Sequence, residues 1–377
     1  MNKLLLTLVA LLSLGSCVSN SQIPSAEEVK QISQRVADWQ ITHFENQQLY
    51  RAPWNGRTVQ DNKIYHDLQW QNAAFYIGLH QFSTITPDPK YRNWLIQMGQ
   101  SHGFKLHERE FHADDHAVGQ LYLSLYEHYK ESDFIEPLKD QFDNMIENEE
   151  ANNWHWWWCD ALFMSPPVWA HLSKITNDPK YLNYMDSQYH MTYDKLWCED
   201  ESLFFRDLKY LDKQEENGEK IFWSRGNGWV FGGLALMIPD LPQDWAGRDF
   251  YIDLFKTMAL KIKEIQREDG TWSAGLLGSI EHYPAIETSG TSFFTFGLAW
   301  GINNGLLDRK IYEPVMFKGW NALMAAVNRD GMLTHVQGVG AAPAASSAEY
   351  TEVYGSGAFL AAGAEVYKYI NNFYDSK

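Results

Sequence analysis

One carboxylate in this chain stands among aromatic side chains. Asp160 lies in the segment Trp154–Pro167, which reads WHWWWCDALFMSPP, after four tryptophans and before an apolar helix entry. An aspartate in such surroundings is expected to lose solvation, which raises its pKa and makes it a proton donor near neutral pH. Indoles such as Trp158 are suited to holding the apolar faces of a sugar, so the segment indicates carbohydrate chemistry. The alternative is a buried aspartate that caps a helix starting near Ser165.

A second segment carries a cation at a predicted helix start. Phe222–Trp229 reads FWSRGNGW, and its two glycines and Asn permit a tight backbone at a helix N-terminus, which is itself an anion site. Arg225 adds a planar guanidinium that suits a carboxylate or a sulfate. Trp229 follows one helical turn later and is placed to stack on the same sugar ring. The alternative is a helix-start turn with a structural Arg–acid pair.

Two adjacent acids open another predicted helix, in the segment Phe111–Gln120. N-cap chemistry with a favourable dipole interaction explains one of them. We expect the other to face the pocket as a second carboxylate, and we favour Asp115 over Asp114.

Three further residues are candidate substrate contacts. Glu287 is the first residue of the sequence ETSG, a predicted helix N-terminus that begins with an acid. Helix capping and a role in the pocket are equally good interpretations of this glutamate. Arg206 is followed directly by Asp207, and a surface ion pair is the usual interpretation of such neighbours. Trp272 lies in an aromatic loop that is equally compatible with core packing.

Composition excludes several classes of partner. The 377 residues carry a formal charge of −17 with 45% hydrophobic and 15% aromatic residues, which suffices for one large or two ordinary domains. This charge argues against nucleic acid and anionic lipid as partners, so an anionic substrate must be attracted locally by arginines. Cys159 and Cys198 match no zinc spacing and no His-Glu-x-x-His occurs; the sequence does not decide whether these two cysteines pair.

The N-terminus predicts export. A basic start and a short apolar run from Leu4 to Leu14 make a secretion signal that is too short for a membrane span. The ending Leu14-Gly15-Ser16-Cys17 resembles a bacterial lipobox, which implies cleavage before Cys17 and a diacylglycerol thioether on it. Residues 1–24 are then signal peptide with lipobox and tether, and the protein is an exported lipoprotein anchored in the periplasm or at the cell surface. An ordinary signal peptide with an incidental cysteine is the alternative.

The rest of the chain has a helical rhythm. Amphipathic segments recur near 26–44, 88–91, 133–148, 178–181, 247–267 and 309–328. Between them, more uniformly apolar helices rich in small residues begin near Trp70, His116, Pro166, Gly226, Gly290 and Gly355. This alternation predicts an all-α fold, an (α/α)₆ barrel (six-hairpin toroid), in which the apolar set lines the middle and the loops before it converge at one mouth. A helical solenoid is the alternative. With no linker after residue 25, residues 25–377 are read as one domain.

Together these motifs resemble glycoside hydrolase family 105, the unsaturated glucuronyl or galacturonyl hydrolases. The motifs are WCDALFM at 158–164, RGNGW at 225–229 and ETSG at 287–290, and the match covers essentially the whole mature chain in order. The resemblance implies an (α/α)₆ barrel and a substrate ending in a 4,5-unsaturated uronate left by a polysaccharide lyase. No metal or organic cofactor is implied.

The resemblance also implies roles for residues. Asp160 is the proton donor that protonates C4 of the alkene, after which water adds at C5 and the hemiketal opens to release the aglycone. Asp115 (or Asp114) corresponds to the second acid, and Arg225 and Trp229 match substrate-binding positions.

The resemblance also bears on the aglycone. By the same resemblance, rhamnogalacturonan-type members have a histidine near the position where this chain has Arg206, which argues against a rhamnogalacturonan disaccharide as the substrate. The lipobox and the segments 112–120, 154–164 and 203–207 are more similar to a branch acting on ulvan fragments, in which the uronate is joined to 3-sulfated rhamnose. An extra Arg at 206 is consistent with that sulfate. Alternatives are an unsaturated rhamnogalacturonyl hydrolase, a helical-toroid polysaccharide lyase and a non-catalytic glycan-binding lipoprotein.

Overall fold

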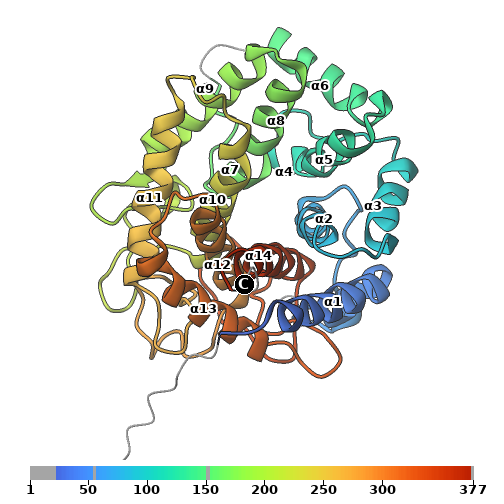
Figure 1. Cartoon of the computed structure of the whole chain (residues 1–377). Helices are drawn as coiled ribbons and strands as arrows, with labels where there is room; N and C mark the ends of the chain where they lie inside the picture. Colours follow the sequence, from blue (N-terminus) through green and yellow to red (C-terminus); the bar gives the residue numbers. More distant parts are fainter. Residues whose placement is uncertain (1–22, 54–56, 150–152, 375–377) are drawn as a thin grey trace, which may run out of the picture.

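The structure is a computed structural model that describes residues 23–53, 57–149 and 153–374. The predicted signal peptide and Cys17 lie outside these ranges. Within them, two concentric rings of helices surround one axis (Figure 1). The outer ring consists of α1 (Ala26–Thr42), α3 (Lys90–Ser101), α6 (Glu136–Glu147), α9 (Pro179–Leu196), α11 (Arg248–Glu264) and α13 (Arg309–Ala325).

The inner ring alternates with the outer one along the chain. Its helices are α2 (Trp70–Ser83), α5 (Gly119–Tyr129), α8 (Pro166–Thr176), α10 (Ser224–Met237), α12 (Thr288–Asn303) and α14 (Val353–Phe373). Short helices α4 (Ala113–His116) and α7 (Ala161–Met164) precede α5 and α8. The ring closes because α14 packs against both α2 and α12. The predicted (α/α)₆ barrel is therefore confirmed.

The connections hold little further structure in the described ranges. They contain the 3₁₀ turns η1 (Phe44–Tyr50), η2 (Val59–Asp61), η3 (Ser132–Phe134), η4 (Leu208–Tyr210) and η5 (Ile238–Asp240). A two-stranded antiparallel ribbon of β1 (Trp197–Cys198) and β2 (Leu203–Phe204) pairs Trp197 with Phe204. None of the described helices combines the length and apolar character that crossing a membrane requires.

Helix starts follow local chemistry. Asp178 caps α9 by accepting a hydrogen bond from the Lys180 backbone N–H at 3.0 Å, and Pro179 occupies the first helical position. The same four-residue motif, Asp-Pro-Lys-Tyr, occurs at 88–91. There α3 begins one residue later in the motif, at Lys90, whose backbone N–H donates to the Asp88 carboxylate at 3.0 Å. Both copies of the motif therefore start a helix, as their Asp-Pro sequence predicts.

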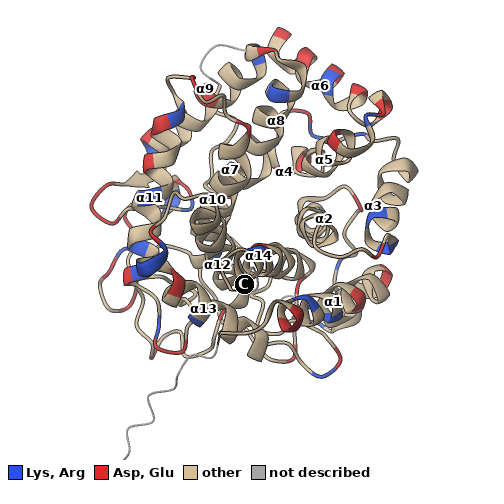
Figure 2. Ribbon diagram, in the orientation of Figure 1, with Lys and Arg blue, Asp and Glu red and all other residues tan. Residues whose placement is uncertain are grey.

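Small residues explain how the inner helices approach one another. A Cβ on Gly78 of α2 would meet the Gly357 carbonyl oxygen of α14 at 1.8 Å, and a Cβ on Gly233 of α10 would meet the Leu162 carbonyl at 2.3 Å. Larger residues would push these backbones apart, so glycine is required at both contacts. The inner helices are mostly free of charged residues, which gather on the outer helices and loops (Figure 2). This distribution is the physical basis of the alternation in the sequence.

Candidate active site

The N-terminal ends of the inner helices form one mouth, and the candidate residues stand there. Asp160 immediately precedes α7, Asp114 and Asp115 lie in the first turn of α4, and Arg225 lies in the first turn of α10. Glu287 immediately precedes α12. Helix N-termini carry partial positive charge, so this end of the barrel favours an anionic ligand.

Asp160 is buried and has a cationic neighbour that is distant in sequence. The Nε of Arg206 lies 3.3 Å from Asp160 Oδ2, and Arg206 Nη1 donates to Asp207 Oδ2 at 2.6 Å. Burial raises the pKa of Asp160, while Arg206 and Arg225 act in the opposite direction. The direction expected from the sequence is thus found, although a cation is present that the local sequence does not reveal.

The two adjacent acids have different surroundings. Asp115 is completely buried and accepts three hydrogen bonds from Arg109: from the backbone N–H at 2.8 Å, from Nε at 3.1 Å and from Nη2 at 2.5 Å. Asp114 has no such clamp; its Oδ2 lies 3.8 Å from Arg109 Nη2. Burial raises the pKa of Asp114 to about 7, with Arg109 opposing and Asp160 contributing. Asp114 therefore shares an electrostatic field with Asp160, whereas Asp115 fixes the loop before α4. The geometry does not favour the sequence-based choice of Asp115.

The four tryptophans divide into structural and accessible members. Trp156 and Trp158 are buried, and Trp158 packs on His112 with ring centroids 4.8 Å apart. Trp157 is 42% exposed. Its ring centroid lies 4.7 Å from that of Trp158 and 5.6 Å from Cζ of Arg206. Trp157 is therefore the most exposed of the four rings, and it packs on the buried Trp158, which was expected to hold substrate directly. Four tryptophans within five residues give no local signal for which one is exposed.

Arg225 is buried, and its hydrogen bonds go to the backbone. Nη1 donates to the Gln337 carbonyl at 2.6 Å and Nη2 to the Gly338 carbonyl at 2.9 Å. Two aromatic rings flank the guanidinium: Cζ of Arg225 lies 4.3 Å from the ring centroid of Trp223 and 4.8 Å from that of Tyr354. Carbonyl partners do not cancel its charge, so Arg225 adds positive potential to the mouth while holding the 337–338 loop in place.

Glu287 is a cap. Its carboxylate accepts from the Ser289 and Gly290 backbone N–H groups at 2.9 and 2.7 Å and from Ser289 Oγ at 2.5 Å. The Gln337 N–H also points to it at 3.3 Å. Of its two equally good interpretations, capping is the one that the structure favours.

Trp229 and Trp272 lie in the core. Trp229 packs between Phe163 and Phe293 with centroids 4.6 and 4.3 Å away. Trp272 is completely buried, and its Nε1 donates to the Ile262 carbonyl at 2.7 Å. Neither ring presents a free face for a sugar, so the expectation that they contact substrate directly is corrected: both are core side chains.

A buried acid that the sequence reasoning did not single out precedes α14. Glu352 accepts a hydrogen bond from the Tyr65 hydroxyl at 3.1 Å, and the Arg51 guanidinium lies 3.8 Å over the Tyr65 ring. Burial raises the pKa of Glu352 to about 7, against the influence of Arg51 and Arg225. Its position before a glycine-rich helix, like that of Glu287, was the available signal.

Cys159 and Cys198 are both buried free thiols, which answers the pairing question. The Cys159 backbone N–H donates to the Arg206 carbonyl at 2.8 Å and so joins the two loops that carry Asp160 and Arg206.

The family model of Glycosyl Hydrolase Family 88 matches residues 32–370. A relative from Formosa agariphila named "Unsaturated 3S-rhamnoglycuronyl hydrolase" is 42% identical over 79% of this chain and 84% of its own length. One from Alteromonas sp. with the same name is 38% identical over 89% of this chain and 85% of its own length. The chain belongs to glycosyl hydrolase family 88 and is a glycoside hydrolase. This match and the two relatives support the kind of enzyme that the motif resemblance to family 105 implies.

Solved structures agree on the fold. A chain described as a polysaccharide lyase has a TM-score of 0.82 at 31% identity, covering 92% of this chain and 99% of that one. A family 88 glycosyl hydrolase from Bacteroides vulgatus has a TM-score of 0.81 at 29% identity, covering 92% and 100%. A structure from Salmonella enterica described as a possible member of family 105 has a TM-score of 0.74 at 17% identity, covering 93% and 96%. That last likeness shows the barrel fold alone.

Proposed function

We propose that this enzyme removes a 4,5-unsaturated uronate from the non-reducing end of oligosaccharides made by a polysaccharide lyase. The observation that carries the proposal is Asp160: a buried carboxyl with a raised pKa, at a helix N-terminus in a mouth that also holds Arg225. Such a site supplies both a proton donor and attraction for a carboxylate. The names of the two curated relatives support the same substrate class.

The reaction is a hydration followed by collapse. Asp160 gives its proton to C4 of the C4=C5 alkene, and water adds its oxygen to C5 while losing a proton to a carboxylate. The resulting C5 hemiketal opens to a ketone, and the hemiacetal left at C1 expels the aglycone as an alcohol. The sum is one water consumed, one alkene lost and one glycosidic bond broken.

Asp114 is the better partner for this step than Asp115. Two carboxyl groups in one electrostatic field do not ionise independently, so a proton on one of them favours the charged form of the other. Asp114 interacts with Asp160 in this way, whereas Asp115 is fully engaged with Arg109. We assign the proton-accepting role to Asp114.

The aglycone is proposed to be 3-sulfated rhamnose, as in ulvan fragments, and the two relatives' printed names support it. Arg206 faces Asp160 and Asp207 in this structure, so its first role is to orient the donor rather than to bind sulfate. A surface hollow offers aromatic faces and one arginine for the aglycone; it is lined by Arg109, Glu110, Phe111, His112, Trp154, His155 and Trp157.

The test follows ultraviolet absorbance of the alkene on ulvan-lyase and rhamnogalacturonan-lyase oligosaccharides, with wild type and Asp160→Asn. We expect absorbance to fall on the ulvan fragments and to stay constant with the variant. A fall in absorbance only on the rhamnogalacturonan fragments would show that the proposed aglycone is wrong, while the proposed reaction would still hold.

Intact polymer separates this proposal from a lyase, the description that one structural neighbour carries. A lyase creates the alkene, so absorbance would rise. Saturable binding by both wild type and Asp160→Asn, without any change in absorbance, would instead favour a glycan-binding protein.

We also propose that Cys17 is lipidated and anchors the exported protein. The support is the sequence Leu14-Gly15-Ser16-Cys17 alone. Expression in a bacterium followed by cell fractionation tests it: Cys17→Ser should move the protein from the membrane to the soluble fraction. Equal membrane recovery of both forms would contradict the anchor.

A further inference from the structure

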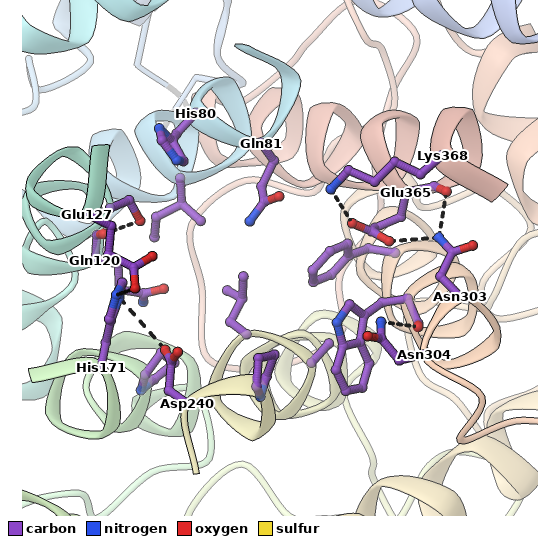
Figure 3. A pocket seen from close by; sticks show the side chains of 18 of the residues that line it. His80, Gln81, Gln120, Glu127, His171, Asp240, Asn303, Asn304, Glu365 and Lys368 are labelled. Carbon is purple, nitrogen blue, oxygen red and sulfur yellow. Dashed lines mark hydrogen bonds and ion pairs between the residues drawn. The ribbon is translucent and has the colours of Figure 1, made fainter. Parts of the chain in front are cut away.

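The end of the barrel opposite the mouth holds a cavity of about 490 Å³. All six inner helices contribute residues to its wall, mostly from their C-terminal halves, and Gln120 of α5 and Pro167 of α8 join them from the first turns. Figure 3 shows the lining from close by. On α10 the wall residue Leu236 lies eleven residues after Arg225, which is about 16 Å along a helix. The residues that line the cavity include none of Asp160, Asp114, Arg225 and Glu287, so it is a different site from the mouth.

Two clusters of charged and polar side chains face each other across this cavity. On one side Lys174 bridges Asp240 at 2.8 Å and Glu127 at 3.1 Å, with His171 Nε2 3.3 Å from Glu127. On the other side Glu365 accepts from Lys368 at 2.8 Å and from Asn303 Nδ2 at 2.8 Å. These pairings hold the carboxylates and amines in fixed positions around the space, and free lone pairs remain on the carboxylate oxygens.

Uncharged polar side chains outside these pairings also line the wall, among them His80 and Gln81. Gln81 extends into the open space (Figure 3). Burial lowers the pKa of His80 to about 4, so its ring is neutral at pH 7 and offers one donor and one acceptor. Together with the Gln81 amide, the neutral His80 imidazole can offer hydrogen-bond donors and acceptors to a polar ligand in this cavity.

The floor is apolar and aromatic. Phe296 and Trp300 of α12, together with Ile77, Leu121 and Leu236, line the cavity. An apolar floor with convergent amide, carboxylate and imidazole groups is the general pattern of a small-molecule site. Hydroxyl groups match the amides and carboxylates, and the apolar face of a pyranose matches the indole.

We propose that this cavity binds a neutral sugar, a mono- or disaccharide without a carboxylate or sulfate. Its charge balance disfavours anions, because three carboxylates stand against two lysines in the lining and the C-terminal ends of six helices add negative potential. The mouth has the opposite character. One barrel thus presents an anion-binding end and a neutral-sugar end.

The experiment titrates the Asp160→Asn full chain by calorimetry with methyl α-L-rhamnoside, with methyl α-D-glucoside and with D-glucuronate. The mouth is first saturated with an unsaturated disaccharide that this variant does not turn over. We expect one site for a neutral glycoside, at least tenfold weaker binding of glucuronate, and at least fivefold weaker glycoside binding in Gln81→Ala.

Controls separate this site from the catalytic one. Gln31→Ala, an exposed glutamine on α1, should leave glycoside binding unchanged, and Gln81→Ala introduced into active enzyme should keep alkene turnover within twofold of wild type. No saturable binding of either glycoside overturns the proposal. Binding that Gln81→Ala leaves intact, or that the disaccharide in the mouth abolishes, overturns it as well. Neither result bears on the hydration reaction, which is measured separately.

Discussion

Arg206 and Asp160 form an ion pair across 46 residues of sequence, with Nε and Oδ2 3.3 Å apart. The same guanidinium holds Asp207 at 2.6 Å, so Arg206 is shared between two carboxylates. When Asp160 carries a proton, Asp207 keeps Arg206 in place. The donor can therefore change its protonation state without losing the group that orients it, which is what a proton-transferring carboxyl requires.

Replacing Asp160 should remove the reaction and keep the fold. Asp160→Asn is isosteric, but its amide cannot deliver a proton to carbon, so we expect kcat to fall about 10²–10⁴-fold or more. Loss of alkene absorbance gives the rate, and the melting temperature of the same sample confirms folding. Activity within tenfold of wild type would show that another group is the donor.

Replacing Arg206 should change the pH dependence more than the specificity. Arg206 lowers the pKa of Asp160, so Arg206→Met should raise that pKa and shift the alkaline limb of the pH–rate profile to higher pH. The profile of kcat against pH measures the shift. If instead Arg206→Met changed the ratio of rates on sulfated and desulfated disaccharides at fixed pH, Arg206 would be a sulfate ligand.

The neighbouring acids should respond in opposite ways. Asp114→Asn should lower kcat about 10²-fold or more with little loss of stability, because this carboxyl interacts with Asp160. Asp115→Ala should destabilise the protein by about 1–3 kcal/mol, because it leaves the Arg109 backbone N–H and guanidinium without their acceptor. Urea unfolding and turnover, measured on both variants, compare the two effects. A stable and inactive Asp115→Ala would return the catalytic role to Asp115.

Glu352 should make the protein less stable as the pH rises. Its folded pKa of about 7 exceeds its ordinary value of 4.5, so between about pH 4.5 and 7 the folded state binds more protons than the unfolded state. Stability from this group is complete below pH 4.5 and is lost as pH rises through 7, by up to about 3 kcal/mol. Glu352→Gln cannot titrate, so its melting temperature relative to wild type should increase from pH 5 to pH 8. A constant difference across this range would contradict the assignment.

Two tryptophans make a matched pair for the aglycone. Trp157→Ala should raise KM several-fold with little change in melting temperature, because the ring is exposed beside the mouth. Trp272→Ala should cost about 3–5 kcal/mol, since a completely buried indole is removed. Steady-state kinetics and unfolding curves compare them. An unchanged KM in Trp157→Ala would remove this ring from the substrate site.

The sequence by itself determined the barrel, because its signals are local. The alternation of amphipathic and apolar helices, and turns such as Asp178–Pro179, depend only on residues within a few positions of each other. The same holds for Asp160 as a desolvated acid at a helix start, since its tryptophan neighbours are adjacent in the chain.

Tertiary structure alone decided the partners. Arg206 reaches Asp160, and Tyr65 reaches Glu352, only after loops distant in sequence meet at one mouth. Asp114 and Asp115 are indistinguishable by spacing, and only the position of Arg109 separates a structural carboxylate from one that interacts with Asp160. Burial separated Trp157 from Trp272 in the same way. Helix periodicity is a short-range property of the chain, whereas charge pairing and exposure depend on how the closed ring brings its loops together.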